Sequence, residues 1–305
     1  MDTRIILIAA GALVMAACSS NTPDVQDSAG EIRLYTEVSV PTRAVDNAAA
    51  LQDDQFVANT DISVMVTDKG DQSTTLAHYD LTTYRADGLG GLTPLTPQYY
   101  PASGNSVEVC AYHPAGTTNT FTVATDQQAL GDYRASDLMW AQLASINKNT
   151  DADERVLMFH HLCSKILVRL IKGNGVTDAE INAATIKLEG GDGENNGLIM
   201  GGSFGSSDGS LNANYNVTGT ITIAENASTT THAAVVIPQD MNGKKITVTL
   251  GGGTQSYTIS GTTFDPGKRY AYTITVNKGE LVVSATITDW TDPEGWTPPT
   301  PTLKI

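Results

Sequence analysis

Cys18 is the first residue of this sequence whose surroundings indicate a definite chemistry. It follows thirteen mostly apolar residues, Ile5 to Ala17, which would rise about 20 Å as a helix and cannot cross a hydrocarbon core of roughly 30 Å. This length, with small residues at the end, is typical of a secretory signal peptide. The run AACSS around Cys18 also matches a bacterial lipobox, in which the cysteine is acylated, for example with palmitate. We therefore expect residues 1–17 to be a lipoprotein signal peptide and Cys18 to carry lipid; an ordinary signal peptide with an incidental cysteine is the alternative.

Two further motifs could belong to enzymes or metal proteins. Residues 201–205 (GGSFG) match the G-x-S-x-G pattern of a nucleophilic serine. That chemistry requires a helix directly after the serine, and none is expected here. Residues 192–197 (DGENNG) resemble the start of a calcium loop, but Ser203 stands where the loop needs a bidentate glutamate. A Gly-rich or Asn-rich turn is the simpler explanation of both, so we expect no enzymatic activity.

Histidines and aromatic residues are the remaining candidates. His160 and His161 are neighbours in a strand-like segment, and their side chains would point to opposite faces and could not share a metal ion. We expect no metal site and no cofactor. The aromatic residues could stack on sugars, although packing in a β-structure is their commoner role; they are Tyr99, Tyr100, Trp140, Trp290 and Trp296.

Composition narrows the classes of protein. The formal net charge is −15 and the isoelectric point about 4.5, which argues against nucleic acid as a partner because a basic surface is needed to bind phosphates. With 40% hydrophobic and 17% charged residues the chain should fold. Besides Cys18 there are Cys110 and Cys163, which export would allow to form a disulfide, although two buried free thiols fit their apolar surroundings equally well.

The first predicted strand is Glu31–Val40. Its residues alternate in polarity, which predicts a half-buried strand. One face carries Thr36 and four apolar residues that we expect to fill a groove: Ile32, Leu34, Val38 and Val40.

The rest of the chain repeats short β-branched runs separated by Gly, Asn, Asp and Pro, which predicts an all-β protein of sandwiches or barrels. The predicted strands are 62–67, 78–85, 106–112, 120–123, 155–171, 185–188, 219–223, 233–237, 245–250, 256–259, 270–276 and 281–290. The sequence from Thr177 to Glu180 predicts a capping box and one short helix. The polar stretch 147–154 predicts a boundary between two domains, 31–152 and 153–305, after a tether at 18–30. A Pro-rich tail begins at about residue 291.

Taken in order, several short motifs resemble those of the fimbrillin (type V pilin) family of outer-membrane lipoproteins. Besides the lipobox and the Thr42-Arg43-Ala44 segment, they are GLTP at 91–94, YPASG at 100–104, VEVCAYHP at 107–114, DLMW at 137–140, FHHLCSKI at 159–166, IPQ at 237–239, FDPGKRY at 264–270 and ITDW at 287–290.

This resemblance implies a fold, partners and a mechanism. The fold would be two tandem transthyretin-like β-sandwich domains with Greek-key-like connections and few short helices. An Arg-specific protease would cleave between Arg43 and Ala44 and release the first strand, and a strand of another fimbrial subunit, of the same or a related kind, would then fill the groove. The protein would be held at the outer membrane and cell surface by its lipid and would serve adhesion as a structural or accessory subunit of a fimbrium.

Two matters stay open at this level. Pro293, Pro298, Pro299 and Pro301 leave only Leu303 and Ile305 alternating in the tail, so the donor strand could instead be Leu281–Trp290, or the chain could be an accessory, anchor or tip subunit. The alternative function is a monomeric surface lipoprotein that binds glycans, with a host or glycan surface as ligand.

Substituting Cys18→Ala tests the lipid anchor. We expect the variant to leave the detergent-soluble membrane fraction and to lose labelling by a radioactive fatty acid, because stable anchoring requires acyl chains. Unchanged membrane retention and unchanged acyl labelling would show that Cys18 is not the lipidated residue.

Overall fold

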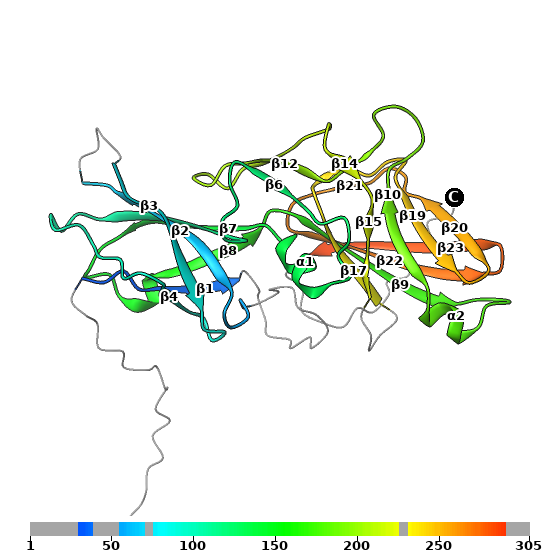
Figure 1. Ribbon diagram of the computed structural model, residues 1–305, viewed down its shortest axis with the longest axis horizontal. Helices are drawn as coiled ribbons and strands as arrows, with labels where there is room; N and C mark the ends of the chain where they lie inside the picture. Colours follow the sequence, from blue (N-terminus) through cyan, green and yellow to red (C-terminus); the bar gives the residue numbers. More distant parts are fainter. Residues whose placement is uncertain (1–29, 39–54, 71–75, 226–230, 291–305) are drawn as a thin grey trace, which may run out of the picture.

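The computed structural model describes residues 30–38, 55–70, 76–225 and 231–290, and this part of the chain is built almost wholly of strands (Figure 1). Strands contain 52% and helices 6% of the described residues, which confirms the predicted all-β class. The helices of the described residues are α1 (Leu130–Ala135), α2 (Asp178–Asn182) and one 3-10 turn (Ala152–Glu154).

Seven strands of the first half form a closed barrel. Their order around it is β1 (Leu34–Val38), β4 (Gly91–Pro94), β3 (Leu76–Ala86), β2 (Asp61–Asp68), β5 (Val107–His113), β7 (Met139–Ile146) and β8 (Val156–His161). Neighbours are antiparallel except β1 and β8, which run parallel. β1 is therefore the element that joins the two ends of the sheet.

The barrel encloses its own hydrophobic core. In β2 the alternate residues Ile62, Val64 and Val66 are fully buried, as a period-two pattern requires. Tyr84 of β3 and Phe159 of β8 are also fully buried in this core. The predicted strands at 62–67, 78–85 and 106–112 thus correspond to β2, β3 and β5, whereas β4 and β7 were not predicted.

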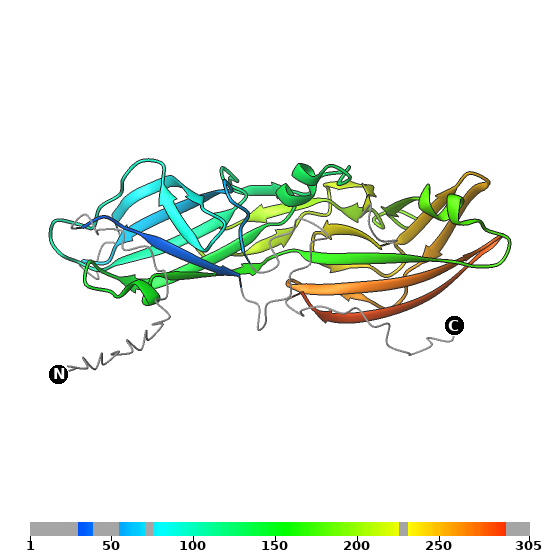
Figure 2. The same ribbon diagram turned by 90° about the horizontal axis from the view of Figure 1, so that it is seen from below.

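The second half places two larger sheets on either side of a second core. One has the order β16 (Ala224–Glu225), β17 (Thr231–Val236), β9 (Ser164–Lys172), β22 (Lys268–Asn277), β23 (Glu280–Asp289). The other has the order β15 (Ile221–Thr222), β10 (Thr185–Glu189), β19 (Lys245–Leu250), β20 (Gly253–Thr258). Buried residues of both sheets, such as Ile166, Ile186 and Ile246, belong to one cluster. Figure 2 shows these sheets at one end of the long axis and the barrel at the other.

Three small sheets complete the second half. The largest joins β6 (Thr120–Thr122), from the first half of the sequence, to β12 (Gly201–Phe204) and β13 (Leu211–Ala213). The others pair β11 (Leu198–Ile199) with β14 (Thr218–Gly219) and β18 (Gln239–Asp240) with β21 (Thr263–Phe264).

The predicted long strand 155–171 is two strands in the structure. β8 ends at His161 in the barrel, and β9 begins at Ser164 in the five-stranded sheet. The run 155–171 contains no proline or glycine and its residues favour strand on both sides of Leu162, so the sequence gives no sign of the break. The domain boundary between residues 152 and 153 stays a prediction: β8, which follows it, pairs within the barrel, and Phe121, which precedes it, lies in the second core.

Three motif residues meet where the two cores adjoin. The Nδ1 atom of His161 lies 2.8 Å from Oδ1 of Asp137, and both side chains are almost fully buried. The His161 ring stacks on Trp290, with centroids 3.9 Å apart. The backbone N–H of Trp290 donates to the Gly267 carbonyl at 3.0 Å, and the Gly267 N–H donates to the Cys163 carbonyl at 2.9 Å, so the chain after β23 is held beside the chain after β8.

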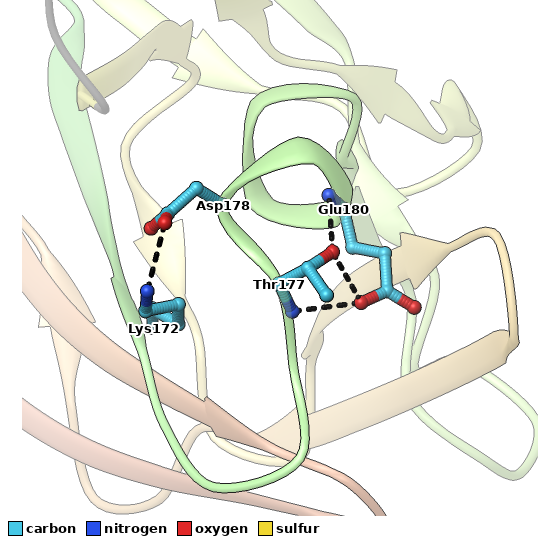
Figure 3. Close-up of polar contacts among 4 residues, drawn as sticks. All are labelled: Lys172, Thr177, Asp178 and Glu180. Atoms are coloured by element: carbon cyan, nitrogen blue, oxygen red, sulfur yellow. Dashed lines mark hydrogen bonds and ion pairs between the residues drawn. The ribbon is translucent and has the colours of Figure 1, made fainter.

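The predicted capping box begins α2 (Figure 3). The Glu180 N–H donates to the Thr177 hydroxyl at 3.2 Å, and the Thr177 N–H donates to the Glu180 carboxylate at 2.8 Å. The Thr177 hydroxyl, which donates to the Glu180 carboxylate at 2.7 Å, and then the Thr177 N–H lower the pKa of the Glu180 carboxyl. Lys172 of β9 contacts Asp178 at 2.8 Å and ties the first turn to the preceding strand.

Cys110 and Cys163 are both free and buried, so the open question of a disulfide is settled in favour of two thiols. Burial and then the Glu108 carboxylate raise the pKa of the Cys110 thiol to about 11. Burial raises the pKa of Cys163 well above its ordinary value. Neither thiol is therefore in the reactive thiolate form near neutral pH.

We expect the folded protein, prepared as Cys18→Ala so that two thiols remain, not to react with Ellman's reagent at about pH 8. At a pKa of about 11 only about one thiol in a thousand is ionised there. Unfolding in guanidinium chloride should release both. Rapid reaction of either thiol in the native protein would contradict the burial described here.

Candidate functional site

The candidate site is the groove of the barrel that β1 fills, between β4 and β8. Tyr35 and Thr36 of β1 lie opposite Val156 and Leu157 of β8 in a parallel register. On the other side Leu34 lies opposite Leu92 of β4. β1 thus has a hydrogen-bonded neighbour along each edge.

Backbone hydrogen bonds along both edges hold the strand. The Tyr35 N–H donates to the Arg155 carbonyl at 3.0 Å, on the β8 side. The Thr36 N–H donates to the Gly90 carbonyl at 2.7 Å, on the β4 side. Because each bond uses only main-chain atoms, another strand of suitable pattern could form the same bonds.

The chain just before β1 is fastened to the 98–100 segment. The Ile32 N–H donates to the Gln98 carbonyl at 2.7 Å, and the Tyr100 N–H donates to the Gly30 carbonyl at 2.8 Å. The Tyr84 hydroxyl donates to the Ile32 carbonyl at 3.2 Å from inside the barrel. Gly30 has a φ of 101°, which side chains other than hydrogen rarely allow.

The inner face of this segment belongs to the barrel core. Ile32 is 0% and Leu34 1% exposed, and Thr36 is also buried. Burial of a side chain the size of Ile or Leu contributes about 1.5–3 kcal/mol, so these two contribute roughly 3–6 kcal/mol before opposing terms. A domain's net stability is only about 5–15 kcal/mol, so loss of this segment without a replacement would destabilise the barrel severely.

The outer face is polar and exposed. Tyr35 and Glu37 are exposed, and Arg33 pairs with Glu31 across 2.9 Å. Alternation of buried and exposed residues therefore follows the sequence pattern from Ile32 to Glu37.

The structure brings together two of the four predicted groove-filling residues, Ile32 and Leu34. Val38 ends β1, but its side chain is outside the described residues. Val40, the predicted cleavage position at Arg43 and Ala44, and the predicted lipidation site Cys18 also lie outside the described residues.

Several groove residues could not be read from the sequence. Tyr84, Gln98 and Arg155 are far from β1 in the chain, and their contacts with it run through the Tyr84 hydroxyl and two main-chain carbonyls. The Arg155 guanidinium donates to the Thr150 carbonyl at 2.8 Å and shapes the turn that leads into β8. Only the short polar run 147–154 signalled a turn there.

The motifs considered for enzymes and metals have other roles. Ser203 lies on β12 with a strand on each side, which is not the strand-to-helix turn of a nucleophilic serine. In the loop that resembles a calcium site, the Asp192 carboxylate contacts Lys245 at 2.6 Å, and the Asn196 side-chain oxygen accepts from Lys244 at 2.8 Å. His160 is exposed and His161 buried, on opposite faces of β8 as predicted.

Among the described residues, no group of three or more His, Cys, Asp and Glu side chains could hold a metal ion. Among the described residues, the aromatic side chains considered for sugar stacking form no shared platform: Trp290 and Tyr100 are buried, Trp140 is half-buried and Tyr99 is exposed. Trp296 lies outside the described residues. The Trp140 indole N–H donates to the Ser206 carbonyl at 2.9 Å.

The fold and the groove define a structural β-protein whose first strand completes a barrel. The chain matches the model of the fimbrillin-like family over residues 42–290, and it belongs to this family. The resemblance seen in the sequence is thereby confirmed. The family is one of fimbrial and cell-adhesion proteins, displayed at the cell surface, and not one of enzymes.

Individual proteins agree with this assignment. A Bacteroides uniformis protein assigned as fimbrium subunit Fim1C is 24% identical over 310 residues, which cover 93% of each chain. A crystal structure of a protein assigned to cell adhesion in Bacteroides uniformis has a TM-score of 0.65 at 18% identity, and covers 87% of this chain and 100% of the other. A protein with the same assignment in Bacteroides ovatus has a TM-score of 0.64 at 19% identity, over 87% and 99%. At these identities the structural likeness concerns the fold.

Truncation of Leu34 tests the contribution of β1. Leu34→Ala should lower the free energy of unfolding by about 2–5 kcal/mol, because it opens a cavity in the barrel core. The matched change Glu37→Ala, on the exposed face of the same strand, should alter it by no more than about 0.5 kcal/mol. Urea unfolding followed by tryptophan fluorescence measures both. Equal effects of the two substitutions would mean that β1 does not support the core.

Proposed function

We propose that the chain is a subunit of a type V fimbrium that joins its neighbours by strand exchange once its first strand has been cut off. The observation that carries this proposal is the position of β1, which is bonded on both edges and buried on one face, yet is the first strand of the described residues. A strand in this position can be removed by a single cut without severing the rest of the fold.

β1 keeps the unassembled subunit closed. Without it, β4 and β8 would expose free N–H and C=O groups, and the barrel core would be open to water. Such a groove accepts an incoming strand through main-chain hydrogen bonds and through pockets for alternate side chains. The order of events that follows is export with β1 in place, cleavage, and replacement by the strand of a partner subunit.

Cleavage after Arg43 fits the arrangement of the neighbouring residues. Arg43 stands five residues beyond Val38, the end of β1, and is flanked by Pro41 and Ala44. Arg33, in contrast, adjoins Ile32, whose N–H is bonded to Gln98, and its guanidinium pairs with Glu31. Proteases cut hydrogen-bonded segments slowly, which disfavours Arg33 and leaves Arg43 as the preferred site.

The tail is the preferred donor. β23 pairs with β22 in ten successive registers from Lys268–Asp289 to Asn277–Glu280, so donating it would dismantle an existing sheet edge. Leu303 and Ile305 of the tail carry the remaining alternation. The proposed partners are other fimbrial subunits, of the same or a related kind, which would receive this tail in their own β1 groove.

Attachment to the outer membrane would come from lipid on Cys18. In the part of the chain that the structure describes, no helix is long and apolar enough to cross a bilayer. Two or more acyl chains would supply stable anchoring.

The assembly step is tested with an arginine-specific protease on the purified full chain. We expect early cleavage after Arg43, release of a peptide containing β1, and multimers that survive dilution and mild denaturant. Arg43→Ala should remain uncut at this position and monomeric, as measured by N-terminal sequencing and size-exclusion chromatography with light scattering.

Arg33→Ala is the matched control, because it removes an arginine from the same region without touching the proposed cleavage site. It should be cut and should assemble like the unaltered chain. If the chain cleaved after Arg43 stays monomeric at high concentration, strand exchange is wrong and the chain acts as a monomeric surface binder.

A further inference from the structure

A hollow of about 370 Å³ lies on the small sheet formed by β6, β12 and β13. Figure 1 shows β6 and β12 along the upper side of the molecule, away from β1. The volume is within the roughly 300–1,000 Å³ range of small-molecule sites. The side chains that matter for its chemistry are Thr120, Thr122, Ser203, Asn212, Asn214 and Tyr215.

Three polar side chains form a row across one face of the sheet. Ser203 of β12 lies opposite Thr120 of β6 on one side and opposite Asn212 of β13 on the other. All three are exposed. Residues directly opposite in antiparallel strands point to the same face, so two hydroxyls and one amide project together.

An aromatic ring stands beside this row. Tyr215 lines the hollow and is 78% exposed, so its ring is accessible to a ligand there. The turn that carries it is fastened at both ends to Met200 and Gly201, where β12 begins. The Asn214 N–H donates to the Gly201 carbonyl at 2.9 Å, and the Met200 N–H donates to the Val217 carbonyl at 2.8 Å.

The same turn has an internal hydrogen bond. The Asn216 N–H donates to the Asn214 side-chain oxygen at 3.0 Å. The tyrosine is therefore presented by a backbone that is already ordered, so binding a ligand against it would cost little conformational entropy.

We propose that this hollow binds a neutral carbohydrate. Hydroxyl and amide groups exchange hydrogen bonds with sugar hydroxyls, and an exposed ring stacks against the apolar face of a pyranose. None of the residues that line the hollow is charged, so an anionic or cationic ligand would find no opposite charge. A purely apolar ligand would leave the Thr120, Ser203 and Asn212 groups without partners, which is unfavourable. This inference goes beyond subunit assembly and does not depend on strand exchange.

The experiment is saturation-transfer NMR on the purified full chain in detergent, titrated with the methyl glycosides of glucose, galactose and mannose and with linear trisaccharides of each. We expect saturable binding of at least one of them. Tyr215→Ala should weaken it about tenfold, the effect of losing one aromatic contact. Tyr215→Phe, which keeps the ring, should stay within about threefold of the unaltered chain.

Tyr99→Ala is the matched control, since Tyr99 is also a surface tyrosine, 49% exposed, but lies outside the hollow. It should bind sugar like the unaltered chain. Ser203→Val, which removes a hydroxyl from the row, should weaken binding with the fold intact by circular dichroism. The proposal is overturned if no neutral saccharide binds saturably, if Tyr99→Ala and Tyr215→Ala weaken binding equally, or if only anionic saccharides such as heparin bind.

Discussion

The parallel pairing of β1 with β8 is the interaction on which the barrel depends. It joins β1, the first strand of the described residues, to β8, which lies about 120 residues later in the chain. The antiparallel pairing of β1 with β4 completes the ring. Ile32 and Leu34 then become part of a core that could not be closed without them. Because the hydrogen bonds come from the main chain, the position requires a strand of the right pattern rather than this particular segment.

The two cores meet through residues of three separate motifs. β8 passes into β9 after only Leu162 and Cys163, and His161, Asp137 and Trp290 pack together where this happens. The buried His161 side chain is hydrogen-bonded to Asp137 and stacked on the Trp290 ring, so it links the end of β8 in the barrel to residues packed in the second half. Of the two histidines considered for metal binding, His161 therefore connects the barrel with the second half, whereas His160 is exposed on the other face of β8.

Two surfaces of the molecule would have separate roles. The β1 groove lies in the barrel and would make the proposed subunit contacts, whereas the hollow beside Tyr215 lies on the small sheet of β6, β12 and β13. Since neither site shares a residue with the other, replacement of β1 leaves the hollow's lining residues unchanged. If both proposals hold, a fimbrial subunit built in this way would present a binding surface at every position in the polymer.

The sequence by itself determined the all-β class, the inward face of Ile32 and Leu34, the capping box at Thr177 and the family, because each depends on local alternation or on short motifs. It missed β7, whose run MWAQLASI lacks alternation, and β12, whose two glycines have low strand propensity. Only the tertiary structure accounts for these two strands. β7 pairs with β5 on one side and β8 on the other. In β12, a side chain at Gly202 would collide with the Asn212 carbonyl, which explains the glycine there. The tertiary structure also decided the break at Leu162, the free thiols and the grouping of Thr120, Ser203 and Tyr215. Each of these depends on contacts between segments far apart in the chain, which no local pattern records.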